Sequence, residues 1–268
     1  GLMGLYLFGT ESLVARHGPA AVSGEKIFCL GNTENIAGSD VAGIRMSAER
    51  VSGGWRLDGT KAFVTNGAIA DLAVVTAVTD PDASRNRRIS MFLVDLGAPE
   101  VRRTKLNKAV WIPSDLTRLT FSDLFVADDC LLGRRGHGLR QVLEVFTRSR
   151  IPISALTLGT AVGAFDLALG HGVKRRIFGA RIFDFQAKAF EFADFYARME
   201  AARMMGYQAC WLKDEGRPFT KEAAMAKLYC SEVMYRCANH SVQLHGGYGL
   251  MKEYDVERYF RDAKVTEI

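Results

Sequence analysis

The stretch GRRGHG, residues 133–138, separates two parts of the sequence that differ in the period of their apolar residues. Before it, short segments alternate apolar and polar residues and are divided by Gly, Asp, Asn or Pro, a pattern typical of β-strands. After it, apolar residues recur at three-, four- and seven-residue spacings, a pattern typical of amphipathic helices. The stretch itself is rich in Gly and Arg, which indicates a connector. The sequence therefore predicts a strand-rich part followed by a helical part.

Residues 41–130 predict a compact antiparallel sandwich or barrel. The expected strands lie within the ranges 42–52, 55–67, 72–80, 88–96, 101–106 and 116–127. Short strands at this spacing, with turn residues between them, are characteristic of such folds. The residues before them look helical up to a turn at SGE, residues 23–25. Because so short a segment cannot form a domain alone, we expect a further segment before Gly1 in the intact protein.

The part after the connector predicts a helical bundle. Two apolar stripes define its helices, one within 183–213 and one of small residues within 219–241. The first stripe comprises Phe185, Phe192, Phe195, Met199, Ala202 and Ala209, and the second comprises Ala223, Ala226, Cys230, Val233 and Cys237. Small side chains along a stripe let helices approach closely. The apolar range 151–169 raises a membrane span as an alternative, but Pro152 and Asp166 within it favour a buried helix of a soluble bundle.

The composition favours a globular protein of a reducing compartment. Of the 268 residues, 48% are hydrophobic and 24% are charged, which argues against a disordered chain. The net charge of +5 is small and dispersed, so it suits a nucleotide or coenzyme but falls short of a nucleic-acid-binding surface. The five cysteines form no CxxC pair, which favours a cytoplasmic setting. No carboxylate at ligand spacing completes a zinc set with His240 and His245, so we assign no metal.

Four further stretches carry residues suited to a flat, phosphorylated ligand. NTENIAGSD (32–40) offers backbone N–H groups and hydroxyls, although a plain hairpin connection also explains it. GTKAFVTNGAIAD (59–71) ends a strand with an aromatic, a β-branched residue and a hydroxyl before an Asn-Gly turn. RRIFG (175–179) follows the end of a helix. QLHGGYG (243–249) places a Gly pair between helical segments, where backbone can approach a pyrophosphate.

In this order the stretches resemble the acyl-CoA dehydrogenase family, and the likeness covers essentially the whole chain. TENIAGSD is similar to the family's TEP-x-AGSD loop, and FVTNG is similar to its WITNG strand. The R-x-x-FG, Q-x-x-GG-x-G and VE-x-x-x-RDAK patterns complete the series at family spacing. The resemblance implies an α+β fold in which an antiparallel β-barrel or sandwich precedes a C-terminal four-helix bundle. It implies that residues 1–25 are a remnant of an N-terminal helical domain, 26–135 the middle domain and 136–268 the C-terminal bundle.

The resemblance also implies FAD as the cofactor. The positions that match the family's cofactor contacts are Leu30, Asn32, Thr33, Phe63, Val64, Thr65, Arg175, Gln186, Gln243, Gly246 and Gly247. The threonine hydroxyls and adjacent amides would bond the polar edge of the flavin ring, whereas the Arg and Gln would reach the nucleotide part in a neighbouring subunit. The family suggests Ser39, Thr147 and Arg150 for acyl-CoA. Two departures, Phe63 for a frequent Trp and Asn35 for a Pro, do not rule out flavin.

The implied reaction is the α,β-dehydrogenation of an acyl-CoA thioester. A carboxylate removes the α-proton while the β-hydrogen leaves as hydride to FAD, and electrons pass to an electron-transfer flavoprotein. In most members the base is a Glu after the segment that RDAKVTEI resembles, so we expect it just beyond Ile268. In other members it lies beside an Arg of the first bundle helix, where Ser149 stands here. Glu144 and Glu267 are the remaining candidates for the base within the chain, although most Glu residues are solvated and have no catalytic role.

Two alternative hypotheses for the function remain. A catalytically silent subunit or scaffold would keep the fold, with or without FAD, and lack the base. Some family relatives bind DNA, but a dispersed charge of +5 disfavours that role. The resemblance otherwise implies a homodimer or homotetramer with no nucleic acid and no membrane span. It implies a cytoplasmic location, or the mitochondrial matrix in a eukaryote.

Overall fold

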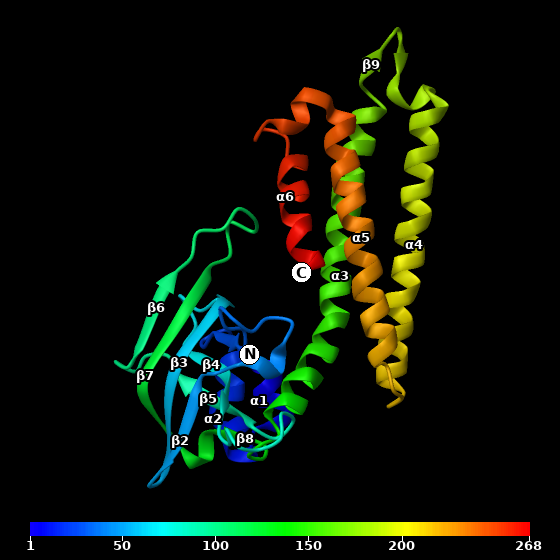
Figure 1. The fold of residues 1–268 in the computed structure, drawn as a ribbon. Helices are drawn as coiled ribbons and strands as arrows, with labels where there is room; N and C mark the ends of the chain where they lie inside the picture. Colours follow the sequence, from blue (N-terminus) through cyan, green and yellow to red (C-terminus); the bar gives the residue numbers. More distant parts are fainter. The chain divides into compact units, whose positions relative to one another are not determined.

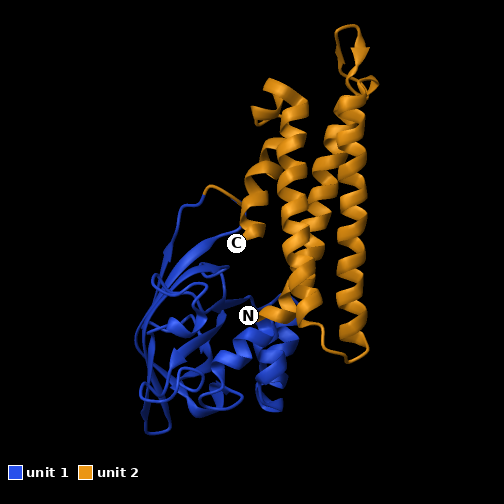
Figure 2. Ribbon diagram, turned by 45° about the vertical axis from the view of Figure 1, so that its right-hand side comes forward, with its two compact units in different colours: residues 1–108, 112–145 blue, residues 109–111, 146–268 orange.

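A computed structural model describes residues 1–268, which divide into two compact units (Figure 2). Unit 1 comprises residues 1–108 and 112–145, and unit 2 comprises residues 109–111 and 146–268. Unit 1 holds the large sheet, and unit 2 holds most of the long helices (Figure 1). The predicted order, a β domain followed by a helical domain, is confirmed.

Unit 1 is built on an eight-stranded sheet. Its strands are β1 (Phe28–Gly31), β2 (Ser47–Val51), β3 (Gly54–Thr65), β4 (Leu72–Val78), β5 (Ile89–Asp95), β6 (Val101–Lys105), β7 (Leu116–Ala127) and β8 (Leu131–Leu132). Their order is β6-β7-β3-β2-β4-β5-β8, with β1 beside β4. Most neighbours are antiparallel, as predicted, but β1 and β2 each run parallel to β4. β2 is shorter than expected, because a 3₁₀ turn, η1 (Val41–Gly43), occupies the start of that segment.

Two short helices precede the sheet, in agreement with the sequence. In α1 (Leu2–Phe8), Gly4 faces the side chains of Val74 and Met91, so the helix lies against the sheet. α2 (Glu11–Val22) begins after Thr10, whose hydroxyl accepts a hydrogen bond from the Leu13 amide at 3.2 Å. Every residue of β4 is buried, and α1 contributes to that cover.

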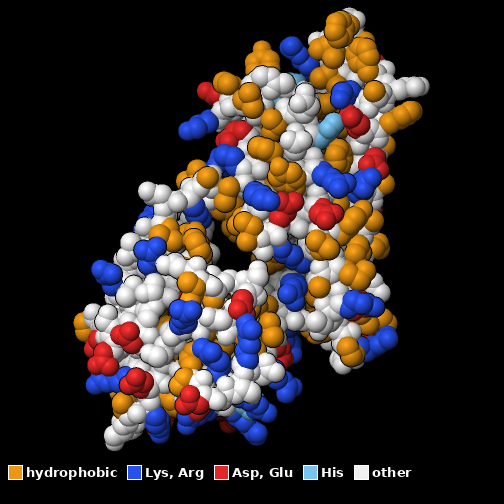
Figure 3. All heavy atoms as spheres, in the orientation of Figure 1, with side chains coloured by type: hydrophobic (Ala, Val, Ile, Leu, Met, Phe, Trp, Pro, Cys, Tyr) orange, Lys and Arg blue, Asp and Glu red, His pale blue; other side chains and the backbone are white.

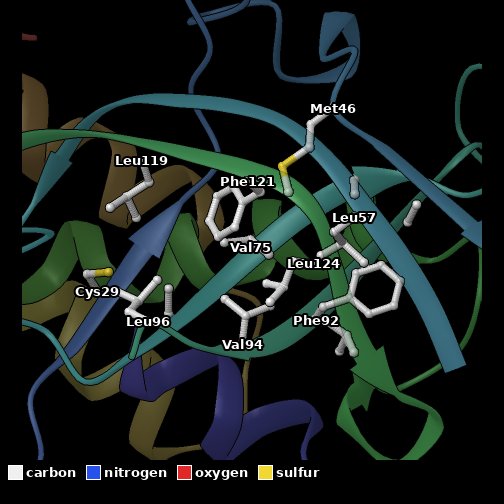
Figure 4. Close-up of a cluster of buried hydrophobic side chains, with 14 of the residues drawn as sticks. Cys29, Met46, Leu57, Val75, Phe92, Val94, Leu96, Leu119, Phe121 and Leu124 are labelled. Atoms are coloured by element: carbon white, nitrogen blue, oxygen red, sulfur yellow. The ribbon is translucent and has the colours of Figure 1, made fainter. Parts of the chain in front are cut away.

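The apolar core of unit 1 is formed by alternate residues of its strands. Cys29 of β1, Leu57 of β3, Val75 of β4, Phe92 of β5 and Phe121 of β7 meet there (Figure 4). Side chains of a strand point alternately to its two faces, which explains the period of two in the sequence. A short 3₁₀ turn, η2 (Asp128–Cys130), links β7 to β8.

Unit 2 is a bundle of four helices. These are α3 (Gly138–Gly172), whose first turns belong to unit 1, α4 (Gln186–Asp214), α5 (Thr220–His245) and α6 (Val256–Glu267). A small hairpin, β9 (Arg176–Ile177) and β10 (Ala180–Arg181), lies between α3 and α4 and is followed by η3 (Ile182–Asp184). Another 3₁₀ turn, η4 (Gly246–Leu250), follows α5. The predicted four-helix bundle is therefore present.

Small residues bring α3 and α5 into close contact, as the sequence predicted. The Ser241 hydroxyl donates to the Ala164 carbonyl at 3.0 Å, and the Cys237 thiol lies 3.6 Å from the Ala161 carbonyl. Such contacts between a side chain and a facing backbone require that neither helix carry a bulky residue there. By length and composition α3 could also cross a membrane, a weak test that core helices of soluble proteins pass. Its buried alanines pack in the bundle core, which accounts for the apolar character of that face.

Candidate functional site

The loop after β1 and the end of β3 lie side by side in unit 1, although about thirty residues separate them in the sequence. The Ala62 amide donates to the Thr33 carbonyl at 2.8 Å. One residue earlier in β3, the Lys61 ammonium donates to the Asn32 carbonyl at 3.2 Å. The structure thus brings the two stretches predicted for the flavin ring together in a single constellation.

A buried ion pair fixes this loop to the strand. The Lys61 ammonium lies 2.8 Å from Glu34 Oε1, and the two side chains are 0% and 7% exposed. Burial lowers the pKa of Lys61 to about 8, although the Glu34 carboxylate acts to raise it. Burial would raise the pKa of Glu34, but Lys61 and the amides of Arg45 and Met46 together lower it. Both charges are hydrogen-bonded, so the pair can hold the loop rigidly.

Two of the residues predicted to bind the cofactor have side chains that are buried within unit 1. Asn32 is 5% exposed, and its Oδ1 accepts a hydrogen bond from the Thr76 hydroxyl at 2.8 Å. Val64 is 1% exposed and belongs to the apolar core. Leu30, in β1, is half-buried. Asn32 and Val64 can therefore contribute main-chain groups to a ligand, but not their side chains.

The other predicted residues of this constellation present their side chains outward. Phe63 is 60% exposed and lies where the β3/β7 register shifts, with a φ of +54°. An aromatic residue in the left-handed region is a genuine outlier, because its Cβ crowds the backbone. Thr65 is exposed, Thr33 is half-buried, and Ser39, predicted for acyl-CoA, is exposed in the loop. The constellation thus offers an exposed aromatic ring and hydroxyl groups beside ordered main chain.

Unit 2 contains a second constellation, where α3 ends and α5 turns into η4. A surface cavity of about 470 Å³ is lined there by Arg175, His171, His245, Gly246 and Gly247, among others. The predicted residues Arg175, Gly246 and Gly247 thus meet in one cavity, although about seventy residues separate them in the sequence. The backbone around Arg175 is fixed, since its amide donates to the His171 carbonyl at 2.9 Å and its carbonyl accepts from Ile182 at 3.1 Å.

The Gly pair gives this cavity a backbone wall. Gly246 has a φ of +60° and a ψ of −138°, a conformation that only glycine adopts readily. A Cβ at Gly246 or at Gly247 would meet no atom within 4 Å, so the space in front of both residues is open. Both are exposed. A ligand can therefore approach the main chain closely at this turn.

The cavity carries a guanidinium and two imidazoles. The Arg175 guanidinium lies over the Tyr248 ring, 5.8 Å from its centroid. The rings of His171 and His245 stack with their centroids 4.2 Å apart, and His245 Nδ1 lies 2.8 Å from the Ser241 carbonyl. Burial, His245 and Arg175 lower the pKa of His171, which keeps that imidazole neutral at pH 7. One permanent positive charge and several hydrogen-bond donors therefore face an open backbone turn, an arrangement suited to a phosphate group.

Comparison with known proteins matches both parts of the chain to one family. Residues 29–124 match the middle domain of acyl-CoA dehydrogenases, and residues 136–268 match their C-terminal domain. A probable acyl-CoA dehydrogenase of Bacillus subtilis is 39% identical over 98% of this chain and 70% of its own length. The mitochondrial short-chain specific acyl-CoA dehydrogenase of Bos taurus is 37% identical over 97% of this chain and 63% of its own length.

The chain belongs to the acyl-CoA dehydrogenase family.

Solved structures of the family show the same fold. Butyryl-CoA dehydrogenase from Megasphaera elsdenii superposes with a TM-score of 0.96 at 36% identity, covering 99% of this chain and 70% of that one. PigA, in a structure with FAD and proline, superposes with a TM-score of 0.96 at 28% identity, covering 100% and 70%. A subunit of the caffeyl-CoA reductase–Etf complex of Acetobacterium woodii is 36% identical over 98% of this chain and 70% of its own length.

The remaining positions predicted from the acyl-CoA dehydrogenase family lie outside the two constellations. Gln186 is the exposed first residue of α4, and Gln243 is exposed in the last turn of α5, three residues before Gly246. Neither lines the cavity that Arg175 and the Gly pair share. Thr147 and Arg150 lie one turn apart on α3, and both are half-buried.

Within the chain, Ser149 stands where some members of the family carry the base, and Glu144 and Glu267 are the remaining candidate bases. Ser149 donates its hydroxyl to the Phe146 carbonyl at 2.9 Å. The Glu267 carboxylate is paired with Lys264 at 2.7 Å on α6, which favours an ordinary solvated carboxylate. Glu144 lines a cavity of unit 1 together with Arg134 and Arg140. A base for an α-proton has to be desolvated, which the ion pair of Glu267 with Lys264 does not favour.

Sequence reasoning missed the residues that support the site rather than face it. Lys61 and Glu34 were present in the quoted motifs, yet nothing in either motif indicated that they pair across 27 residues. In the RDAK segment, the Asp262 carboxylate accepts the Trp111 amide at 2.7 Å, and Arg261 pairs with Glu257 at 2.6 Å. The one available signal was a Lys directly before the apolar Ala62, Phe63 and Val64, because a Lys that is buried with such residues needs an acidic partner.

Proposed function

We propose that this chain forms the middle and C-terminal domains of an FAD-dependent acyl-CoA dehydrogenase, with 26–135 and 136–268 as the respective domains. Membership of the acyl-CoA dehydrogenase family supports the assignment of the chain to an oxidoreductase. The observation that supports FAD as the cofactor is that most of the predicted contacts gather into two constellations, each with open main chain and suitable polar groups. When bound, FAD would supply the hydride acceptor for oxidation of the CoA thioester.

The residues of unit 1 suit the flavin ring. Main-chain groups of Asn32, Val64 and Thr65, with the hydroxyls of Thr33 and Thr65, are proposed to bond its polar edge. The exposed Phe63 ring offers an apolar face of the kind that packs on a planar heterocycle. The Lys61–Glu34 pair would hold this surface in one conformation before the ligand arrives, so little ordering is left for binding.

The residues of unit 2 suit the nucleotide part. The Arg175 guanidinium is proposed to bind the pyrophosphate, which the open turn at Gly246 and Gly247 lets approach the main chain. Gln186 and Gln243, which lie outside that cavity, are retained as proposed amide contacts of the nucleotide part. PigA, at 28% identity, is a relative whose structure contains FAD, which supports the assignment of the cofactor.

For the substrate, we retain Ser39, Thr147 and Arg150 as proposed acyl-CoA contacts. Polarising hydrogen bonds on the thioester carbonyl would make the α-proton more acidic, and a Glu expected after Ile268 would remove it. Electron transfer to an electron-transfer flavoprotein is proposed because the related caffeyl-CoA reductase subunit belongs to a complex with Etf. A homodimer or homotetramer, located in the cytoplasm or in a mitochondrial matrix, completes the proposal.

The test is an anaerobic titration of the purified protein with a panel of acyl-CoA thioesters, followed by the visible absorbance of the flavin. Bleaching by at least one thioester supports the dehydrogenase. The second candidate is a silent subunit, because Ser149 supplies no carboxylate at the position where some members of the family carry the base. A yellow protein that no thioester bleaches would support that candidate. A colourless protein that takes up no FAD would contradict the dehydrogenase and leave only a scaffold without FAD.

A further inference from the structure

The cavity of unit 2 contains a polar side chain to which the proposed function gives no role. His171 is in the last turn of α3, four residues before Arg175, and both side chains line the cavity of about 470 Å³. The imidazole is half-buried, and neither of its ring nitrogens forms a hydrogen bond with another residue. Figure 3 shows histidine side chains at the surface of unit 2. His171 therefore offers two free ring nitrogens to a molecule in the cavity.

The neighbouring His245 supports the His171 ring. The two rings stack with their centroids 4.2 Å apart and an angle of 28° between their planes. His245 is 7% exposed, and its Nδ1 donates a hydrogen bond to the Ser241 carbonyl at 2.8 Å, so α5 holds this ring in place. A neutral imidazole has a single N–H, which His245 thus uses within the protein. Of the two histidines, His171 is the one that has an N–H to donate to a phosphate oxygen.

The groups that surround His171 are positively charged or neutral. The segment after α3 presents Arg175, α5 presents His245, and η4 presents Tyr248 to the same cavity. β9 and η3 line it with isoleucines, and no carboxylate lines it. The Tyr254 ring packs against His245, with the two ring centroids 6.0 Å apart. Without a bound anion these surroundings disfavour a proton on His171, in agreement with its lowered pKa, which burial, His245 and Arg175 cause.

A pyrophosphate group beside Arg175 reverses this balance. Its negative charge offsets that of the guanidinium, and an opposite charge close to an imidazole favours the protonated form. Its oxygens also accept hydrogen bonds from the protonated ring, and such charge-assisted bonds are stronger than neutral ones. Binding of the anion and binding of a proton to His171 therefore strengthen each other, since coupling between two binding events is reciprocal.

We propose that His171 is a further contact of the FAD pyrophosphate and that it takes up a proton when FAD binds. This inference rests on the proposed binding of the nucleotide part of FAD by Arg175 and the Gly turn. The affinity for FAD is lowest where His171 is neutral in both the free and the bound protein. It increases as the pH falls, because the bound protein accepts the proton at a higher pH than the free protein does.

Two properties keep this effect separate from other consequences of low pH. The pyrophosphate of FAD is a diester, so its own charge does not change near neutral pH. The stability of the free protein changes in the opposite direction, because protonation of His171, whose pKa is lowered by burial and by its cationic neighbours, destabilises the fold. Partial unfolding would therefore weaken the binding of FAD at low pH, whereas the proposed contact strengthens it.

The experiment is isothermal titration calorimetry of the flavin-free protein with FAD. From about pH 8 to about pH 5.5, a range that spans the ordinary titration of histidine, the wild type gains about tenfold in affinity. Two buffers with different heats of ionisation reveal net proton uptake on binding. An affinity that stays constant or falls, with no proton uptake, overturns the role of His171 and leaves the FAD proposal standing. No binding of FAD at any pH overturns both.

A substitution then assigns the proton to His171. His171→Gln keeps an N–H donor but cannot be protonated, so it binds FAD nearly as the wild type does at about pH 8 and loses most of the increase at low pH. His17→Gln, in α2 of unit 1, is the matched control, because His17 also has a lowered pKa, and it keeps the increase. Urea unfolding shows that each variant is folded; if His171→Gln is not, proton uptake by the wild type decides. A wild-type increase in folded His171→Gln contradicts the proposal.

Discussion

The two constellations proposed for FAD differ in how the chain holds them. In unit 1, a buried ion pair and a buried amide lie behind the surface, and the proposed contacts combine main-chain groups with two hydroxyls and the Phe63 ring. In unit 2, the proposed contacts are a guanidinium and an exposed Gly turn beside an open cavity. The first constellation depends on the fold for its shape, whereas the second depends on individual exposed groups. We therefore expect the largest loss of stability from a substitution in unit 1, and mainly a loss of FAD affinity from substitutions in unit 2.

The largest effect is expected for Lys61→Met. The substitution leaves the Glu34 carboxylate buried without its cation, which should lower the free energy of unfolding by about 3–5 kcal/mol. Urea unfolding followed by circular dichroism measures this change. Adding Glu34→Gln should recover part of the loss, because the buried charge is then gone. Lys105→Met, at an exposed position of β6, is the control and should stay near wild type. If Lys61→Met unfolded at the wild-type urea midpoint, the ion pair would not stabilise unit 1, and the proposed difference between the two constellations would be wrong.

For Gly246→Ala we expect a smaller loss of stability and a loss of affinity for FAD, because a side chain would stand in the open turn where the pyrophosphate is proposed to approach the main chain. Alanine at a φ of +60° and a ψ of −138° is strained by about 1–3 kcal/mol. Gly247→Ala is the matched control, since no positive φ is required there and its Cβ would meet open space in the free protein. Comparing the unfolding midpoints of the two variants isolates the backbone requirement. Equal midpoints would show that the turn tolerates a side chain.

Arg175→Gln should lower the affinity for FAD without changing the stability of the protein. The side chain is exposed, so we expect an unfolding midpoint within experimental scatter of the wild type. Loss of a charged hydrogen bond to a pyrophosphate costs about 1.5–3 kcal/mol, which raises the dissociation constant of FAD about ten- to a hundredfold. Quenching of flavin fluorescence measures that constant. Arg236→Gln, an exposed arginine of α5, should bind FAD as the wild type does.

The smallest effect concerns pH. The pKa of His171 is lowered in the folded state by burial, His245 and Arg175, so the unfolded chain binds the proton more readily. Its contribution to stability is present above the ordinary pKa of 6.5 and is lost as the pH falls below it. The urea midpoint should therefore decrease below pH 6.5. In His171→Phe this decrease should be smaller, though still present, because His17, His137 and His240 also have lowered pKa values.

The sequence predicted the elements of the fold because each carries a local signal. The period-two segments became β3, β4 and β7, and the small-residue stripe became the buried face of α5. It could not predict that β1 and β2 run parallel to β4, because strand pairing is decided by packing far along the chain. The burial of Val64 and of the Asn32 side chain was hidden for the same reason. Motif positions identified the proposed ligand contacts, whereas the Lys61–Glu34 support could only be seen once the segments were assembled.

The central claim is the proposal that the constellation in unit 1 binds the flavin ring and that the constellation in unit 2 binds the nucleotide part of FAD in a neighbouring subunit. Its most direct test is to strip the purified protein of any bound flavin, titrate it with FAD and follow the flavin fluorescence. We predict saturation at one FAD per chain, weakened by Arg175→Gln and unaffected by Arg236→Gln. If the protein takes up no FAD, or if the two variants bind it equally well, the account is wrong.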